Sequence, residues 1–555
     1  MSPKYRNPVL FADYSDPDVI RVKDLYILTA SSFNYVPGLP ILVSKDLVNW
    51  KLETYAVEEV SEDGTKGIPH EDSEAIGKRF LVPRHSEGVW APSIRYHAGM
   101  YYIYYGMPDE GIYVVTAEDP LGPWSKPVCV RPAKGFIDPC PYWDEDGRAY
   151  IVHAYARSRI GFKSILGIFE ITPDGTKAIS EDQFIFDGND PRHPEITIEG
   201  PKVYKRNGYY YILAPAGGVT FGWQVALRSR DIHGPYEVRT VMDQGDTVIN
   251  GPHQGALIDS QDGREWFLHF QDRGLYGRIC HLQPVVWKED WPIIGIDANS
   301  DGIGNPVHTW SFPEEEGEKT PLESSDLFRD HKIGLQWQWL GNLAENPLAA
   351  CGGKDGIALR ALNLSGEDFP IIWHSSNVLT QKIVMPEFMM DVRMDAAKLE
   401  EGNRAGILMM GGQYCTLYAC REDAHTRIFL AESEGDDQNK REIVKASFDL
   451  GAEACEDLTF RMIFVRSSKA SVSEQGEVTI RDAASPDLYY CNYDSEKPVL
   501  RIFFRCGNGE FKDSGCRFTP SDHTWVGAKT GLYALARTGA KSGIARFRSV
   551  TAEEL

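Results

Sequence analysis

Short apolar stretches separated by polar turns dominate the first half of the chain and predict strands rather than helices. Five of these stretches share an aromatic or apolar core that follows a short polar turn, at residues 25–28, 101–104, 149–152, 209–212 and 266–269. No long segment shows a convincing apolar period of 3.6 residues, which an amphipathic helix would require. The first half of the chain is therefore expected to be built from β-strands.

The spacing of the five cores indicates a repeated four-stranded unit. Successive aromatic anchors are 76, 48, 60 and 56 residues apart, taking Tyr26, Tyr102, Tyr150, Tyr210 and Trp266. These distances suit the four-stranded blades of a propeller better than helical repeats. Residues 1–310 are therefore predicted to form a five-bladed β-propeller.

The second half of the chain has a different sequence pattern. Residues 311–326 contain an acidic run and two prolines, which are typical of a linker. Residues 327–555 consist of short alternating strands with glycine-rich turns, which favour a β-sandwich of the jelly-roll type. The whole chain is predicted to be all-β.

One isolated residue of a functional type precedes each anchor by ten to thirteen positions: Asp16, Trp90, Asp138, Glu199 and His253. The innermost strand of each blade lines the channel of a propeller, so one recurring position would gather these side chains around the axis. Carboxylates that meet raise one another's pKa and can divide acid and base work. Each acid also stands at or beside a proline, where a stiff backbone could hold it. Alternation alone does not choose Asp16 over Asp18, because both share the same parity.

The sequence around these residues resembles that of glycoside hydrolase family 43. The motifs that carry the resemblance are Asp16-Pro17, Asp138-Pro139, Glu199-Gly200-Pro201, Gly277-Arg278 and Trp291-Pro292, and residues 334–339 are similar to the sandwich attached to the family's β-xylosidases. The resemblance implies a five-bladed propeller enzyme that releases terminal pentose from oligosaccharides derived from plant hemicellulose. Its substrate would be an oligosaccharide that ends in β-D-xylose, α-L-arabinofuranose or both.

The resemblance also assigns roles to the three carboxylates. Asp16 would be the general base that activates water, and Glu199 the general acid that protonates the leaving oxygen. Asp138 would adjust the pKa of the acid and orient it. Such an enzyme inverts the anomeric centre, which requires about 6.5–9.5 Å between base and acid so that a water molecule fits.

Further site residues follow from the same resemblance. Arg278 would donate hydrogen bonds to the sugar, although a surface ion pair is its alternative. Phe33 and Trp90 would form apolar walls, or else pack in the core. Phe518 of the sandwich would close one side of the pocket. His253 matches a histidine that holds Ca²⁺ through water in some family members, with an ordinary core histidine as the alternative; no other cofactor is required.

Departures from the family pattern leave the substrate open. Ile137, Cys140 and Lys202 differ from the residues common at these places around the sugar pocket. β-D-Xylosidase activity is favoured, and an enzyme acting on α-L-arabinofuranosides alone is the second interpretation. A carbohydrate-binding propeller without catalysis is a third, but a binding protein gains nothing from a proton donor held opposite a base. A retaining fructosidase on the same fold is disfavoured because its opening motif is absent.

The net charge and the cysteine content limit which partners and which cellular location are expected. The 555-residue chain carries a net charge of −22, which argues against binding to nucleic acid or to anionic membrane surfaces. No stretch approaches the roughly 18 apolar residues of a membrane span, and Met1 is not followed by an apolar secretion segment. If Met1 is the native start, we expect a cytoplasmic protein, and its ten cysteines without a CxxC pair to be reduced thiols. The sequence leaves a homo-oligomer open.

Overall fold

The computed structural model describes residues 3–60, 77–452, 455–481 and 496–555, which divide into two compact units. The first unit extends to Leu322 and the second begins at Glu323. Two short segments from the first half of the chain, Phe80–Pro83 and Arg273–Gly277, belong to the second unit. The second unit is therefore not one continuous stretch of sequence.

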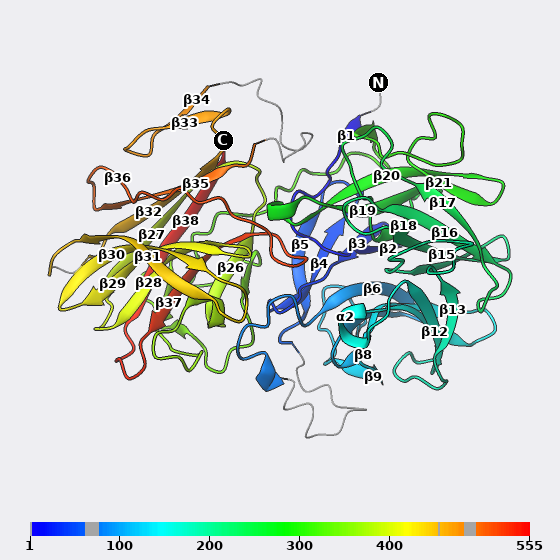
Figure 1. Cartoon of the computed structure of the whole chain (residues 1–555), viewed down its shortest axis with the longest axis horizontal. Coiled ribbons are helices and arrows are strands. Elements are labelled where there is room, and N and C mark those ends of the chain that lie inside the picture. Colours follow the sequence, from blue (N-terminus) through cyan, green and yellow to red (C-terminus); the bar gives the residue numbers. More distant parts are fainter. Residues whose placement is uncertain (1–2, 61–76, 453–454, 482–495) are drawn as a thin grey trace. The chain divides into compact units, whose positions relative to one another are not determined.

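The first unit is the predicted five-bladed propeller, made of five antiparallel four-stranded sheets in simple sequence order (Figure 1). The first three blades contain β2 (Asp18–Val22), β3 (Leu25–Thr29), β4 (Gly38–Ser44) and β5 (Lys51–Val57); β6 (Trp90–His97), β7 (Met100–Met107), β8 (Gly111–Ala117) and β9 (Val128–Pro132); β10 (Phe136–Trp143), β11 (Ala149–Tyr155), β12 (Ile165–Ile171) and β13 (Gln183–Asp187). The last two contain β14 (Lys202–Arg206), β15 (Tyr209–Ala216), β16 (Trp223–Ser229) and β17 (Glu237–Met242); β18 (Gly255–Asp259), β19 (Glu265–Asp272), β20 (Arg278–Lys288) and β21 (Trp291–Ile294). A short helix, α2 (Arg157–Ile160), follows β11.

The apolar cores found in the sequence pack between neighbouring blades. Tyr104 of the second blade and Ile151 and Phe169 of the third are at most 1% exposed and share one cluster. Burial of such a side chain contributes about 1.5–3 kcal/mol. The repeated cores therefore hold adjacent blades together.

The ring closes through the two ends of the unit. The first strands of the blades contact one another, β18 with β2, β2 with β6, β6 with β10 and β10 with β14. In addition, β1 (Lys4–Arg6) pairs with β22 (Thr309–Ser311), and the Asn7 amide donates to the carbonyls of Leu282 and Val307 at 2.9 and 2.7 Å. Glu314, in the predicted linker, accepts hydrogen bonds from the Tyr26 hydroxyl and the Gln261 amide, at 2.5 and 2.7 Å. The start of that segment therefore belongs to the closed propeller.

The second unit is a β-sandwich of two seven-stranded antiparallel sheets, as predicted. One sheet contains, in order, β23 (Trp337–Trp339), β26 (Val378–Lys382), β37 (Lys529–Ala536), β28 (Asn403–Met410), β29 (Tyr414–Glu422), β30 (His425–Glu434) and β31 (Arg441–Asp449). The other contains β24 (Leu348–Ala349), β25 (Ile357–Arg360), β38 (Ile544–Glu554), β27 (Phe388–Lys398), β32 (Leu458–Val465), β35 (Val499–Cys506) and β36 (Lys512–Asp513). The remaining elements are a hairpin of β33 (Ala470–Val472) and β34 (Val478–Ile480), and the 3₁₀ turns η1 (Gly274–Tyr276) and η2 (Ile372–His374).

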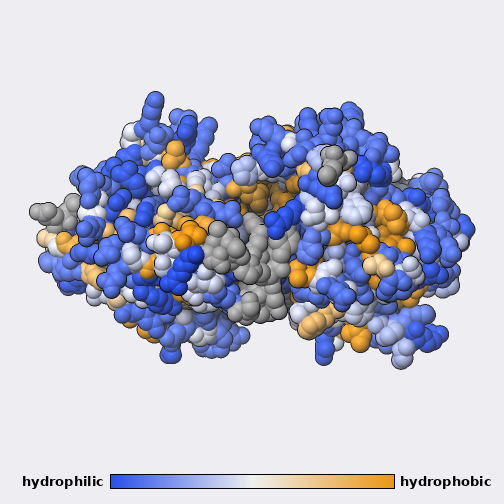
Figure 2. All heavy atoms as spheres, turned by 90° about the horizontal axis from the view of Figure 1, so that it is seen from above, coloured by the Kyte–Doolittle hydropathy of each residue, from blue (hydrophilic) through white to orange (hydrophobic). Residues whose placement is uncertain are grey.

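The surface agrees with the acidic, polar composition. The face drawn in Figure 2 is mostly hydrophilic, with small separate hydrophobic areas. All nine cysteines within the described residues are free thiols. In the part of the chain that the structure describes, no helix has the length and apolar character needed to cross a membrane.

Candidate active site

A left-handed backbone residue recurs at or near the start of the innermost strand of every blade. These residues are Asp16 (φ 53°), Ala91 (φ 35°), Asp138 (φ 56°), Gly200 (φ 57°) and Gly251 (φ 47°). Glycine adopts this conformation freely, and aspartate tolerates it better than most residues do. In the second and third blades the strand register also shifts at this point, between Trp90 and Ser93 and between Ile137 and Cys140. Each functional side chain is thus placed by a left-handed turn, and not only by the neighbouring proline.

Asp16 is held by two donors at the entrance to β2. Its carboxylate is buried; Oδ1 accepts from Nη1 of Arg278 at 2.9 Å and Oδ2 accepts from the Ser31 hydroxyl at 2.6 Å. The Ser31 oxygen in turn accepts the backbone N–H of Ala91 at 2.7 Å. The first, second and fifth blades therefore fix the orientation of the Asp16 carboxylate together.

Asp138 and Glu199 form a second, coupled pair of acids. The backbone N–H of Gly200, next to Glu199, donates to Oδ2 of Asp138 at 2.8 Å. Burial raises the pKa of Asp138 well above its usual value, and the negative charges of Glu199 and Asp16 raise it further. Burial likewise raises the pKa of Glu199 to about 7, where Asp16 adds to the effect and Arg278 opposes it. Both shifts favour the protonated form of these carboxyl groups.

The three acids differ in access to solvent. The side chain of Glu199 is 32% exposed, whereas the side chain of Asp16 is 10% exposed and Asp138 is buried. A substrate can thus reach Glu199 directly. A carboxyl group that is accessible and has a pKa near neutrality meets the requirements of a general acid.

Arg278 contacts one of the acids rather than forming a surface ion pair. Its guanidinium is buried, lies 4.6 Å from the centre of the Phe270 ring and donates to Asp16. The backbone N–H of Arg278 donates to Oδ1 of Asp13 at 3.0 Å. The surface alternative raised by the sequence is wrong, and the contact with sugar stays a prediction.

The two predicted aromatic walls lie close together. Phe33 and Val89, the residue before Trp90, exchange backbone hydrogen bonds of 2.9 and 3.0 Å. The indole N–H of Trp90 donates to the Ser86 carbonyl at 3.0 Å, and the Arg159 guanidinium lies 5.4 Å from the Trp90 ring centre. Phe33 and Trp90 are 4% and 7% exposed. Both rings are thus largely buried, and their contact with a sugar face stays a prediction.

His253 lies beside the exposed acid, with its Nε2 3.5 Å from Oε1 of Glu199. It is buried, neither ring nitrogen has a hydrogen-bond partner among the described residues, and burial holds its pKa well below the usual value. The ring is therefore neutral and is not a satisfied core histidine.

The residues near His253 do not form a direct metal site. Within the described ranges, no three His, Cys, Asp or Glu side chains are grouped closely enough to hold an ion. Ca²⁺ prefers six to eight oxygen ligands, so the donors here do not fit an ion bound directly by protein. A Ca²⁺ ion held through water near His253 stays a prediction.

A largely buried charged cluster, close in sequence to the acids, was not predicted from the sequence. We call Asp18, Arg95, Lys202 and Cys140 the blade clamp. Oδ2 of Asp18 accepts from Arg95 Nη1 and from the Ile94 amide, both at 2.7 Å, and Arg95 Nη2 lies 3.0 Å from the Cys140 sulfur. Lys202 Nζ donates to the Pro92 carbonyl and the Ser93 hydroxyl at 2.9 and 2.7 Å, and lies 3.8 Å from Oδ1 of Asp18. The cluster joins four blades.

The blade clamp follows the acids closely in sequence. Asp18, Cys140 and Lys202 come two, two and three residues after Asp16, Asp138 and Glu199. The positive charge of Lys202 also opposes the rise in the pKa of Asp138. The pattern that could have revealed the cluster was this repeated spacing, together with a lysine in an otherwise apolar strand start. It also separates Asp18, which is inside the clamp, from Asp16, which is at the site.

Phe518 belongs to the sandwich unit. It is 9% exposed and exchanges backbone hydrogen bonds of 2.7 and 3.1 Å with Leu500 of β35. These contacts explain why this segment is ordered beside the sheet. The contact of Phe518 with the sugar stays a prediction.

Comparison with known families divides the chain in the same way. Residues 5–292 match the model for glycosyl hydrolases family 43. Residues 325–553 match the model for the beta xylosidase C-terminal concanavalin A-like domain. The first match covers the propeller, with all three acids, and the second covers the sandwich.

Several named proteins resemble the chain over most of its length. A putative beta-xylosidase of Xylanibacter ruminicola is 37% identical over 418 residues, which is 75% of this chain and 73% of that protein. A beta-xylosidase of Formosa agariphila is 29% identical over 96% of this chain and 87% of its own length. A non-reducing end alpha-L-arabinofuranosidase of Bacteroides ovatus is 29% identical over 66% of this chain and 67% of its own length. The solved GH43 protein BlXynB of Bacillus licheniformis shares the fold over all of both chains, with a TM-score of 0.76 and 21% identity.

Proposed function

The chain belongs to glycosyl hydrolases family 43 and is a glycosidase, and we propose that it removes one terminal pentose at a time from hemicellulose-derived oligosaccharides with inversion. The observation that carries this proposal is the contrast between two acids in one site. Asp16 is buried and held by Arg278 and Ser31, whereas Glu199 is accessible and has a pKa of about 7. These environments suit a base and an acid respectively.

The proposed reaction is a single displacement. Asp16 accepts a proton from a water molecule as the water oxygen bonds to the anomeric carbon. The bond from that carbon to the leaving oxygen breaks at the same time, and Glu199 gives its proton to that oxygen. Asp138 holds the backbone beside Glu199 through the Gly200 N–H. The negative charge of Asp16 favours the protonated form of Glu199.

β-D-Xylose is the favoured terminal sugar, because two of the relatives that match this chain over most of its length are named as beta-xylosidases. α-L-Arabinofuranose is the second candidate, on the ground that a relative from Bacteroides ovatus is named for that activity. Both sugars present similar hydroxyl groups to a small pocket. The proposal therefore includes an enzyme that accepts both.

Parallel assays separate the two sugars. Rates on nitrophenyl β-D-xylopyranoside and nitrophenyl α-L-arabinofuranoside should show activity on at least one, with the xyloside preferred. Proton NMR during the first minutes of xylobiose hydrolysis should show α-xylose as the first product, as inversion requires. No release from any pentoside would overturn the proposed substrate class, and β-xylose as the first product would overturn inversion.

A further inference from the structure

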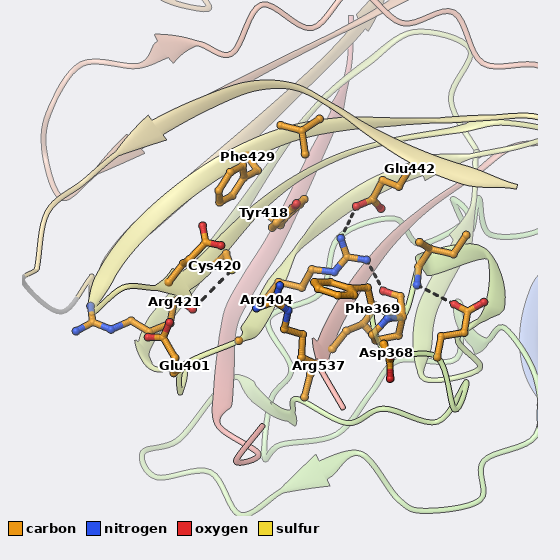
Figure 3. Close-up of a pocket in the computed structure, with 18 of the residues that line it drawn as sticks. Asp368, Phe369, Glu401, Arg404, Tyr418, Cys420, Arg421, Phe429, Glu442 and Arg537 are labelled. Atoms are coloured by element: carbon orange, nitrogen blue, oxygen red, sulfur yellow. Dashed lines mark hydrogen bonds and ion pairs between the residues drawn. The ribbon is translucent and has the colours of Figure 1, made fainter. Parts of the chain in front are cut away.

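The sandwich has a pocket of its own, with a volume of about 740 Å³, on one face of the sheet that contains β28–β31 and β37 (Figure 3). Volumes of about 300–1,000 Å³ are typical of ligand sites. The proposed reaction uses none of the residues that line it. We propose that this pocket binds an uncharged oligosaccharide segment of the substrate polymer.

The strand register places Tyr418 and Phe429 side by side at the pocket. Gly406 of β28 pairs with Tyr418 of β29, which pairs with Phe429 of β30. A Cβ atom on Gly406 would collide with the Leu417 carbonyl oxygen, so the close backbone approach requires glycine. The Tyr418 and Phe429 rings, which both line the pocket, stack with their centres 5.4 Å apart.

A fixed pair of charges forms one side of this space. The Arg404 guanidinium bonds to the carboxylate of Glu442 and donates to the Pro370 carbonyl at 2.6 Å. The Tyr414 hydroxyl donates to the other carboxylate oxygen of Glu442 at 2.8 Å. Figure 3 shows Arg404 extended across the pocket between Phe369 and Glu442. A guanidinium offers five N–H groups, so Arg404 retains donors for a sugar hydroxyl after these two contacts.

The charges in the pocket balance. Its lining includes five acidic residues (Glu367, Asp368, Glu401, Glu422 and Glu442) and five basic residues (Arg404, Arg421, Lys440, Arg441 and Arg537). A phosphate, a nucleic acid or a strongly charged peptide would therefore gain little net attraction. Sugar hydroxyl groups, which donate to carboxylates and accept from guanidinium groups, suit this mixture.

The pocket also has an exposed aromatic side chain. Phe369 is 62% exposed, and the Arg537 guanidinium lies 3.9 Å from its ring centre. With the half-buried Phe429, it offers apolar surface for the C–H faces of sugar rings, whereas Tyr418 is buried behind Phe429. Polar groups beside aromatic faces are the combination that an oligosaccharide needs. The choice of a pentose polymer as ligand rests on the proposed function.

Affinity electrophoresis of the full chain in gels that contain soluble arabinoxylan tests the proposal. All proteins carry Asp16→Asn, so that the polymer is not hydrolysed. Phe369→Ala should raise the dissociation constant for arabinoxylan by about tenfold, the loss expected for one aromatic stacking contact. The matched control is Phe184→Ala, because Phe184 is 61% exposed but lies on β13 of the propeller. Thermal unfolding should be the same for both variants.

The outcomes separate this proposal from the proposed function. Equal retardation of Phe369→Ala and the control, or no retardation at all, would overturn the proposed saccharide binding by the pocket. This holds even if the wild type hydrolyses nitrophenyl pentosides. Retardation that depends on Phe369 supports the pocket even if no pentoside is hydrolysed. Equal retardation by hydroxyethylcellulose and by arabinoxylan would overturn the assignment to a pentose polymer. Binding of the chain to an acidic or basic peptide in place of arabinoxylan would overturn the saccharide assignment.

Discussion

The propeller centre and the sandwich pocket both gather charged side chains, but they balance charge in opposite ways. Three carboxylates meet in the propeller, with Arg278 in contact with one of them and the pKa of Glu199 raised to about 7. The sandwich pocket is lined by five acids and five bases, among which Arg404 and Glu442 form an ion pair. Unbalanced buried charge keeps a proton available for transfer. Balanced charge offers hydrogen bonds to a neutral ligand without raising the pKa of a carboxyl group. The propeller site therefore suits catalysis, and the sandwich pocket suits ligand binding.

The largest expected effect is a loss of catalysis in the propeller that leaves binding by the sandwich pocket intact. Asp16→Asn removes the proposed base, and kcat should fall by about 10³- to 10⁴-fold on every pentoside, whatever the leaving group. Stopped assays on nitrophenyl xyloside and on xylobiose measure this. Retardation by arabinoxylan should persist in the same variant, and retained turnover would exclude Asp16 as the base.

Glu199→Gln should show a smaller loss that depends on the leaving group. The proton from the acid matters for xylobiose, where kcat should fall by about 10²-fold, and much less for an activated aryl xyloside, whose leaving group needs little protonation. Equal losses on both substrates would contradict the assignment of Glu199.

The pH profile provides a second check on the same residue. Glu199 must be protonated to act, and its pKa is raised to about 7, so kcat/KM of the wild type should fall as pH rises through about 7. The amide that Glu199→Gln introduces does not titrate, so this alkaline decline should disappear in the variant on the activated substrate. A wild-type profile that stays flat from about pH 6 to about 8.5 would rule out the proposed acid.

The smallest expected effect concerns the blade clamp. Lys202→Met removes a positive charge that opposes the rise in the pKa of Asp138, so protonation of the acids becomes easier and the alkaline decline should move to higher pH. We expect a loss in kcat of about tenfold, below the 10²-fold that a misplacement of about 1 Å can cost. Lys205→Met is the matched control, because Lys205 lies on the same strand but pairs with Asp144 and Glu145. A purely structural role would lower thermal stability without moving the profile.

The local pattern of apolar and polar residues was sufficient to predict much of the architecture. Aromatic anchors such as Tyr102 are buried between blades, and alternation along each strand already determines which face is apolar. Chemical type at a recurring offset also singled out the three acids. Parity could not distinguish Asp16 from Asp18, because residues two apart on a strand share a face. The left-handed turn at Asp16 and the ion pair of Asp18 with Arg95 separate them.

The sequence by itself thus determined the fold class, the number of blades and the recurring position of the acids, since these follow from short-range periodicity and residue type. The choice of Asp16 over Asp18 came from the resemblance to family 43. Only the tertiary structure decided which charges face each other. Arg278 reaches Asp16 across 262 positions, Lys202 approaches Asp18 across 184, and Arg404 meets Glu442 across 38. Burial and partner charges set a pKa, and both depend on contacts between distant segments that no local pattern encodes.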